Sequence, residues 1–274
     1  MAMAEIDIQI NKIRQYYDSR ARSFKGQSAV SMPDSFLINL ENKVLRRYIL
    51  KKGHLLDAGC ANGYSSLEFA KSGQLKVTGV DYSEAMILDA QKLLTTNPKK
   101  LQKKVNFKVG NVLDLKEKDN HYDQVVSKRC IINLPTWELQ QKALNEFIRV
   151  LRPKGALILS EASLQGWQNM NQLRKEFGLP IIPQPWHNLY LDDHKLLLHL
   201  GKKAELVAVI NFSSTYYLGS RVLQPFIIGR DREPRYDSEI NRLFSILPSI
   251  GDYGTQKLYL FKKHPPFIAR KKKK

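Results

Sequence analysis

The chain has few cysteines and no long hydrophobic run. Among its 274 residues the only cysteines are Cys60 and Cys130, which excludes a disulfide-stabilised scaffold. Apolar runs such as residues 196–198 fall far short of the roughly 18 residues that a membrane-spanning helix requires. Glu5 and Asp7 interrupt the first apolar residues, so no signal-peptide core is expected. These absences predict a soluble protein of a reducing compartment, the cytoplasm.

Acidic residues are too few to balance the basic ones. The chain has 44 Lys and Arg against 26 Asp and Glu, a formal net charge of +18 at pH 7. Part of the excess is local, in a basic tail at residues 270–274 and a lysine cluster at residues 99–104. This balance favours an anionic partner such as nucleic acid, a membrane surface or an acidic metabolite. A solvated tail and loop explain the same residues, so the charge alone does not assign nucleic-acid binding.

Strands alternate with helices through the middle of the chain. Short apolar runs predict strands at residues 54–57, 76–80, 105–109, 122–127 and 156–159. Helical spacing predicts helices between them at residues 65–71, 84–94 and 137–151. Such alternation indicates a parallel sheet covered on both faces. Right-handed crossovers then make it a doubly wound α/β fold.

The flanking segments are predicted to have other roles. Residues 5–19 and 35–50 have helical spacing, and the second helix is expected to bury a face with Phe36, Leu40, Val44 and Tyr48. Two further strands are predicted at residues 205–212 and 257–261. The predicted parts are an N-terminal helical cover at 1–52, a ligand-binding core at 53–160, a lid and acceptor insertion with short helices at 161–204, a C-terminal sheet edge with its own insertion at 205–264, and a basic tail at 265–274.

One turn concentrates the chemical information. Asp57-Ala58-Gly59-Cys60-Ala61-Asn62-Gly63 follows the first core strand and precedes a helix. Glycine lets the backbone approach a ligand, and a helix N-terminus offers free N–H groups, which suits a nucleotide or an amino-acid carboxylate. The dinucleotide pattern needs Gly where this chain has Gly59, Ala61 and Tyr64, so NAD and FAD are disfavoured. No Gly-Lys-Ser/Thr follows, which excludes a Walker loop.

Polar and aromatic residues close the next two strands. Asp81 ends the second strand, where a carboxylate can accept hydrogen bonds from the hydroxyls of a ribose. Tyr82 and Met86 either contact an adenine or pack in the core, and Asn111 is placed to bond the adenine edge. An N-cap role for Asp81 stays open, with Ser83 as the competing cap.

These motifs resemble those of the class I S-adenosylmethionine-dependent methyltransferases. Their first motif, acidic-x-Gly-x-Gly-x-Gly, is matched by Asp57, Gly59 and Gly63, with Ala61 in place of the middle glycine. Their second motif, an acidic residue at the end of strand two, is matched by Asp81. The resemblance implies an enzyme of this class, a methyltransferase that binds S-adenosylmethionine.

A third pattern extends the resemblance. Residues 150–155, Val-Leu-Arg-Pro-Lys-Gly, match the family's helix that ends in a hydrophobic-Arg/Lys-Pro-x-Gly turn. The match covers about residues 36–165 well and the last strand weakly. It implies a Rossmann-like, seven-stranded, mostly parallel sheet whose sixth and last strands pair antiparallel. It also implies these cofactor-binding residues: Asp57, Gly59, Ala61, Asn62, Gly63, Asp81, Tyr82, Met86, Asn111, Val112, Tyr17 and Ser127.

The methyl acceptor is expected to bind in the variable segments. Tyr16 and Tyr17 are expected to fold over the cofactor as a lid. Candidate general bases are His187, whose ordinary pKa lies near working pH, and Glu161, although a structural role is the favoured reading of each. The candidate acceptor residues are Arg129, Trp186, Tyr190 and Tyr216.

Two other chemistries are not expected after the fourth strand. Cys130 follows Arg129 rather than a proline, so it is interpreted as a small packing residue and not as a nucleophile. Ser127 and Lys128 stand where metal-dependent members carry carboxylates, so no metal is predicted.

The layout resembles the small-molecule branch of the family. The main expectation is methyl transfer to a small molecule, at a hydroxyl oxygen, by in-line displacement. An RNA methyltransferase that uses the basic surface is the alternative, although no RNA-binding appendage is recognisable. A catalytically inactive binding partner is the third hypothesis, and the intact Asp57, Gly59, Gly63 and Asp81 argue against it.

Overall fold

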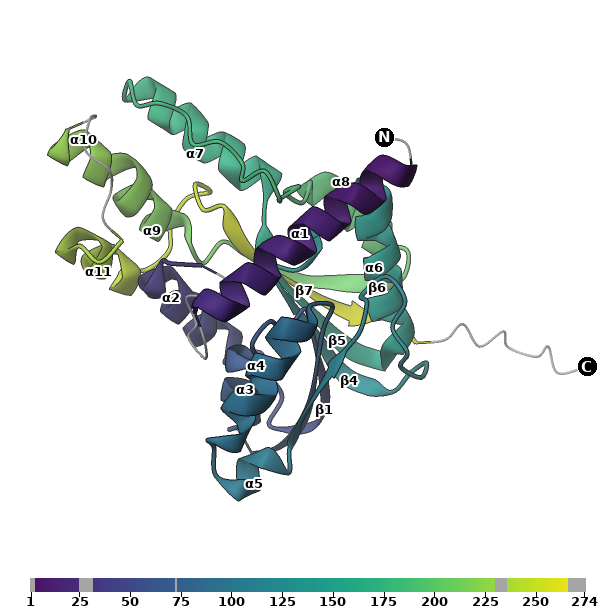
Figure 1. Ribbon diagram of the computed structural model, residues 1–274. Helices are drawn as coiled ribbons and strands as arrows, with labels where there is room; N and C mark the ends of the chain where they lie inside the picture. The colour runs from purple at the N-terminus through teal and green to yellow at the C-terminus, as the bar shows by residue number, and fades with distance from the viewer. Residues whose placement is uncertain (1–2, 25–31, 72, 230–235, 266–274) are drawn as a thin grey trace, which may run out of the picture.

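The computed structural model describes residues 3–24, 32–71, 73–229 and 236–265. A seven-stranded sheet runs through it in the order β3-β2-β1-β4-β5-β7-β6 (Figure 1). Its strands are β1 (Lys52–Ala58), β2 (Gln74–Asp81), β3 (Val105–Val109), β4 (Tyr122–Lys128), β5 (Leu151–Ala162), β6 (Ala204–Ile210) and β7 (Gln256–Lys263). β7 is antiparallel to β5 and β6, and the other pairs are parallel. The predicted doubly wound fold, with its antiparallel edge pair, is confirmed.

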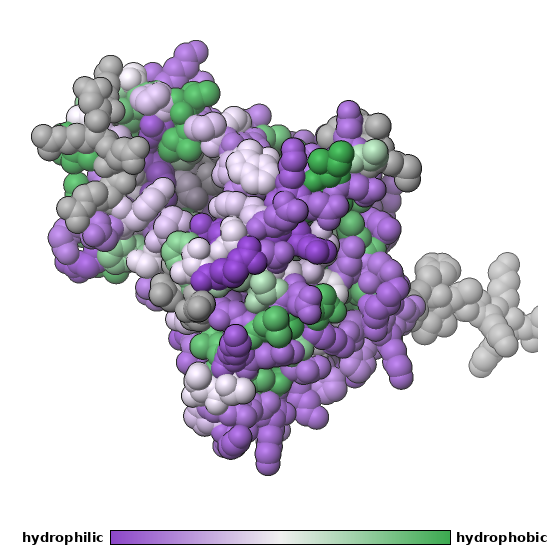
Figure 2. Space-filling model, viewed as in Figure 1, coloured by the Kyte–Doolittle hydropathy of each residue, from purple (hydrophilic) through white to green (hydrophobic). Residues whose placement is uncertain are grey.

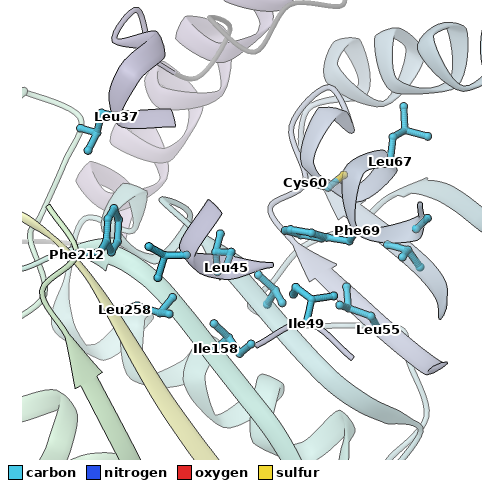
Figure 3. Close-up of a cluster of buried hydrophobic side chains, with 14 of the residues drawn as sticks. Leu37, Leu45, Ile49, Leu55, Cys60, Leu67, Phe69, Ile158, Phe212 and Leu258 are labelled. Carbon is cyan, nitrogen blue, oxygen red and sulfur yellow. The ribbon is translucent and has the colours of Figure 1, made fainter. Parts of the chain in front are cut away.

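Helices cover both faces of the sheet. They are α1 (Met3–Ser23), α2 (Ser35–Leu45), α3 (Tyr64–Ala70), α4 (Glu84–Thr95), α5 (Lys99–Gln102), α6 (Trp137–Val150), α7 (Leu164–Glu176), α8 (Asp193–Leu200), α9 (Ser214–Tyr217), α10 (Gln224–Ile228) and α11 (Glu239–Ile246). Successive strand residues point to opposite faces, so Leu55 and Leu56 belong to different hydrophobic layers. In the first layer, Leu45 of α2 packs in one cluster with Phe212 and Leu258 (Figure 3). The second layer is covered by α6 and α8.

The second helix ends earlier than its spacing predicts. α2 stops at Leu45, and the following turn is held by Gln124 of β4, whose side chain bonds the carbonyl of Tyr48 and the N–H of Leu50. The predicted buried face is also wrong in part. Tyr48 is 38% exposed, because it lies beyond the end of the helix. Glu41 is buried in the face that α2 turns toward the sheet.

The segment after β5 is more regular than expected. α7 is one helix of 13 residues, which Ser163 caps by accepting a hydrogen bond from the N–H of Gly166. α8 contributes Leu196 and Leu200 to the second hydrophobic layer, so it packs on the sheet. Four short helices were not predicted from the sequence: α5, α9, α10 and α11. α1 lies side by side with α4, across the top of the sheet in Figure 1.

Candidate functional site

A cavity lies at the carboxyl ends of the central strands. Its wall includes Gly59 and Ala61 from the turn after β1, Asp81 at the end of β2, and Arg129 just after β4. The strand order reverses between β1 and β4. In doubly wound sheets, ligands bind outside the carboxyl ends of the strands at such a reversal. The topology therefore places the predicted motifs around one ligand-sized space.

The turn between β1 and α3 has a left-handed backbone at three positions. The angle φ is +77° at Gly59, +47° at Ala61 and +75° at Gly63. A Cβ at Gly59 would lie 2.4 Å from the sulfur of Cys130, so this position requires glycine. Ala61 adopts a conformation that costs an L-residue roughly 1–2 kcal/mol. Its N–H donates to Oδ2 of Asp81 at 2.8 Å, which helps to hold that conformation.

Asp81 connects the two turns that border the cavity. Its Oδ2 accepts the Ala61 bond, and its Oδ1 accepts a hydrogen bond from the N–H of Ser83 at 2.9 Å. Ser83 is the N-cap of α4, since its hydroxyl oxygen accepts from the N–H of Met86 at 3.1 Å. The capping role left open for Asp81 therefore belongs to Ser83. Burial removes water from the carboxylate of Asp81 and raises its pKa. A hydroxyl donor in the cavity would stabilise the charged form of this carboxylate.

A second cavity adjoins the first on the other side of the glycine turn. Both are lined by Gly59, Ala61, Lys128 and Arg129. Asp57 lines only the second cavity. Asn62 is also in the second wall. The buried carboxylate of Asp57 accepts a hydrogen bond from the Ser66 hydroxyl at 2.5 Å, and burial raises the pKa of Asp57 to about 6.

Helix α1 forms a roof over the first cavity. Ile10, Ile13 and Tyr17 of this helix line the space. The Tyr17 hydroxyl donates to Oδ1 of Asn133 at 3.1 Å, and the Tyr82 hydroxyl donates to the carbonyl of Ile10 at 3.4 Å. The roof is thus attached to both sides of the cavity, and of the predicted lid tyrosines it is Tyr17 that lines it.

The residues predicted to contact adenine lie along one wall. Met86 and Val112 are buried, and both line the cavity with Tyr82 and Asn111. Asn111 is exposed, and its Oδ1 accepts a hydrogen bond from the N–H of Leu113 at 2.9 Å. The oxygen expected to meet the adenine edge is therefore engaged within its own turn.

Ser127 and Glu161 lie in the core and are not part of the cavity wall. Both side chains are fully buried, and the Ser127 hydroxyl donates to Oε1 of Glu161 at 2.7 Å. The backbone N–H groups of Cys130, Ile131 and Ile132 also donate to this carboxyl group. Burial raises the pKa of Glu161 to about 7. These bonds hold the segment after β4 in place below the cavity.

His187 packs beside the roof helix. Its ring centroid lies 4.6 Å from that of Tyr16 and 5.9 Å from that of Tyr17. Burial lowers the pKa of His187, and its Nδ1 is enclosed without a hydrogen-bond partner in the described residues. Trp186 also packs on Tyr16 and is 58% exposed. Neither residue lines the two cavities described above.

The other predicted acceptor residues are dispersed. Tyr216 is buried, and its hydroxyl donates to Oδ1 of Asp34 at 2.6 Å. Tyr190 packs edge-on against Trp167. Of the four candidates, Arg129 lies in the cavity wall.

Sequence reasoning missed Glu41, and it did not single out Asn133 within the segment after the fourth strand. Asn133 stands in the segment after β4, a few residues beyond Arg129, and it lines the cavity. Glu41 is a charged residue on the buried face of α2, where it pairs with Lys128 and Arg129. An acidic residue among apolar neighbours of a helix was the available signal for Glu41.

The strand order, the glycine turn and the acidic end of β2 together define the class I methyltransferase fold. Residues 49–193, just over half of the chain, match the model of a methyltransferase domain, and the chain belongs to this family. An O-methyltransferase of Aspergillus nomiae is 30% identical over 149 residues, which are 53% of this chain and 61% of that protein. The chain spans between half and about three fifths of the length of the first curated relatives it matches.

Solved structures show the same fold. A magnesium protoporphyrin IX methyltransferase from Synechocystis, with bound SAH, has a TM-score of 0.59 at 18% identity over 92% of this chain and 98% of that chain. A putative methyltransferase in a complex with the Haloferax volcanii Trm112 activator has a TM-score of 0.62 at 16% identity over 94% of this chain and 100% of that chain. At such identities the likeness establishes the fold alone.

The residues of this chain fit S-adenosylmethionine, the cofactor of the family. Asp81 offers carboxylate oxygens in the wall for ribose hydroxyls, and Met86 and Val112 offer an apolar surface for a base. Gly59 lines both cavities, and because it has no side chain, a ligand can approach its backbone closely. Within the described ranges, no group of three or more His, Cys, Asp and Glu residues is arranged to hold a metal ion. No helix in those ranges has the length and hydropathy needed to cross a membrane.

Proposed function

We propose that this protein transfers a methyl group from S-adenosylmethionine to a hydroxyl oxygen of a small molecule. The observation that carries the proposal is the cavity between the glycine turn, Asp81 and the roof helix α1. The O-methyltransferase named among the relatives supports the choice of an oxygen acceptor.

The chain's own residues would bind and orient the reactants. When bound, the cofactor supplies a methyl group on a sulfonium, so the acceptor needs mainly alignment and, for a hydroxyl, a proton acceptor. Asp81 would hold the ribose, while Tyr82, Met86 and Val112 would enclose the base. Tyr17 in the roof would restrict access of water to the methyl end.

Charge placement favours a small molecule over RNA. The lysine cluster at residues 99–104 lies on and beside α5, which precedes β3. β3 is parallel to β2, so α5 sits at the amino ends of the strands, opposite the cavity. The end of the molecule where α5 lies in Figure 1 is hydrophilic in Figure 2. The predicted basic tail lies outside the described residues, apart from Pro265.

Calorimetry tests the cofactor site. Wild-type protein should bind S-adenosylmethionine in the micromolar range, and Asp81→Ala should weaken this binding about tenfold or more because charge-assisted hydrogen bonds are lost. Asp119→Ala is the matched control, since that carboxylate is 67% exposed near the amino end of β4. An absence of heat with the wild-type protein would refute the proposal.

A transfer assay tests the acceptor. Labelled cofactor should pass its methyl group to a member of a pool of hydroxylated small molecules and not to RNA. Labelling of RNA that persists in a protein lacking residues 270–274 would instead support the RNA alternative. Cofactor binding without transfer to either pool would indicate an inactive binding partner.

A further inference from the structure

The lysine cluster on and beside α5 has basic neighbours in two other turns. Residues 46–52 lead into β1, residues 71–76 lead into β2, and residues 99–104 lead into β3. These strands are adjacent and parallel, so the three segments lie at the same end of the sheet, which we call the basic end. The segments contain no Asp or Glu and ten basic residues: Arg46, Arg47, Lys51, Lys52, Lys71, Lys76, Lys99, Lys100, Lys103 and Lys104.

Hydrogen bonds join the three segments of the basic end. The N–H of Gln74 donates to the carbonyl of Lys51 at 2.7 Å, which links the first segment to the second. Nζ of Lys104 donates to the carbonyl of Gly73 at 2.7 Å, which links the third segment to the second. The basic residues therefore belong to one surface and not to three separate turns.

Most of this positive charge faces solvent. The side chains of Arg46 and Lys71 are each 56% exposed, although both pair with the carboxylate of Glu68. α5 and the residue that follows it present three exposed lysines: Lys99, Lys100 and Lys103. A dense set of like charges on one surface creates a positive potential, which attracts a polyanion.

Two exposed apolar side chains accompany the charges. Tyr48 and Leu50 are each 38% exposed, and they lie between Arg47 and Lys51 in the chain. The side chain of Gln124 bonds the backbone of both residues, so the turn that presents them is held in place. Lysine pairs with anionic lipid headgroups, while tyrosine and leucine favour the boundary between headgroups and acyl chains. The basic end thus offers both charge and apolar contact to a bilayer.

The basic end is remote from the cavity. Gly59 of the cavity wall directly follows Ala58, the last residue of β1, whereas Lys52 is the first residue of that strand. β1 has seven residues, which at about 3.3 Å per residue separates its two ends by about 20 Å. In Figure 1, α5 lies at the opposite end of the molecule from α7 and α8. A partner on the basic end would therefore leave the cavity accessible.

We propose that the basic end docks this protein on the surface of a bilayer that contains anionic lipids. Its lysines pair with lipid headgroups, and Tyr48 and Leu50 enter the headgroup region. Eight of the ten basic residues are lysine, whereas nucleic-acid phosphates are recognised best by the bidentate geometry of arginine. Leu50 also has no apolar partner on a phosphate backbone. In the docked protein the cavity faces away from the membrane, so the reactants reach it from water.

Vesicle sedimentation tests this surface. The wild-type protein should bind vesicles of phosphatidylcholine and phosphatidylserine, less tightly as salt is added, and it should bind far less to phosphatidylcholine alone. A triple variant with Lys99→Gln, Lys100→Gln and Lys103→Gln should bind the anionic vesicles about hundredfold more weakly, since each lysine near the surface contributes about fivefold. A wild-type protein that does not bind the anionic vesicles would overturn the proposal.

A second triple variant of the same net charge is the matched control. Lys12→Gln, Lys175→Gln and Lys195→Gln remove three exposed lysines from α1, α7 and α8, and this variant should bind nearly as tightly as the wild type. Both triple variants retain residues 270–274. Equal binding by the two would overturn the proposal and assign adsorption to the net charge or to these last residues. Melting temperatures near that of the wild type would show that both are folded.

A single apolar substitution separates a bilayer from a nucleic acid. Leu50→Ser should weaken binding to the anionic vesicles several-fold, whereas Ile181→Ser, at a 64% exposed site outside the basic end, should not. Single-stranded RNA is the comparison, measured by fluorescence anisotropy at the same salt concentration. The proposal would be overturned in favour of a nucleic acid if RNA bound more tightly than the vesicles, with an affinity that falls in the variant of residues 99–103 but not in Leu50→Ser. These measurements use neither cofactor nor acceptor, so they are independent of the proposed methyl transfer.

Discussion

The hydroxyl of Tyr17 donates a hydrogen bond to Oδ1 of Asn133, 116 residues later in the chain. Nδ2 of Asn188 donates to the same oxygen at 2.8 Å, so α1, the segment after β4 and the segment after α7 meet at one amide. Burial raises the pKa of Tyr17 well above its ordinary value, so its hydroxyl remains a donor at working pH. The roof of the cavity is therefore tied to the residues that border the methyl end.

Removing this tie should loosen the roof. Tyr17→Phe deletes one neutral hydrogen bond, worth about 1 kcal/mol or about fivefold in an equilibrium constant. We expect S-adenosylhomocysteine to dissociate several-fold faster, measured by stopped-flow displacement, with little change in its association rate. Tyr16→Phe is the control, since Tyr16 packs against His187 and does not line the cavity. Similar rates in the two variants would contradict the role given to Tyr17.

Replacing Ala61 by glycine, in the turn between β1 and α3, should stabilise the folded protein. Ala61→Gly relieves the cost of a left-handed alanine, which exceeds the entropic cost of glycine by about 0.5–1 kcal/mol. The melting temperature, measured by scanning calorimetry, should rise by about 2–4 °C per kcal/mol. Ala58→Gly, in the buried strand β1, should lower it. A lower melting temperature for Ala61→Gly would show that its methyl group contributes packing that outweighs the strain.

Glu161 should make stability depend on pH. Its pKa is near 4.5 ordinarily and about 7 in the folded protein, because it is buried. Between these values the folded state retains a proton that the unfolded state has released, so the free energy of unfolding falls as pH rises. We expect the free energy of unfolding of Glu161→Gln, measured by denaturant titration, to rise relative to that of the wild type as the pH increases from about 5 to about 8. If the free energies of unfolding of the two proteins changed in parallel with pH, Glu161 would not titrate in this range. Glu239→Gln is the control, because this carboxylate is exposed.

His187 packs beside the roof helix and lines neither cavity, so kinetics must decide between the predicted general-base role and a packing role. His187→Phe preserves a ring against Tyr16 but has no proton acceptor. A general-base role predicts that kcat falls about hundredfold or more with KM for the cofactor unchanged. Because burial lowers the pKa of His187, the wild-type rate should persist to lower pH than for an ordinary histidine. An unchanged kcat in His187→Phe, as in a Trp186→Phe control, would assign the residue to packing.

Local patterns predicted the elements of the core. β3 has the predicted bounds, and β1, β2 and β4 extend the predicted strands by one to three residues at their ends. An apolar run between turn residues is a short-range signal, and a parallel sheet buries it on both faces. The same locality explains why Gly59 and Asp81 were found: each is placed by the strand that immediately precedes it.

Contacts between distant residues were not predictable in this way. Glu41 is 87 and 88 positions away from the two cations it pairs with, and Tyr216 is 182 positions from Asp34. Whether a polar side chain faces a cavity or a buried partner depends on how the elements pack. This is why Tyr216 was predicted to meet an acceptor but instead bonds the cap of α2.

The amino-acid sequence by itself determined the doubly wound core and the order of its strands and helices along the chain, because periodicity and turn chemistry act over a few residues. It also determined the family, because the glycine turn and Asp81 are local motifs. Only the tertiary structure decided which side chains of α1 line the cavity, that Glu41 joins Lys128 and Arg129, and that Glu161 is buried in the core. Those relationships arise from packing between segments far apart in the chain, and no local pattern records them.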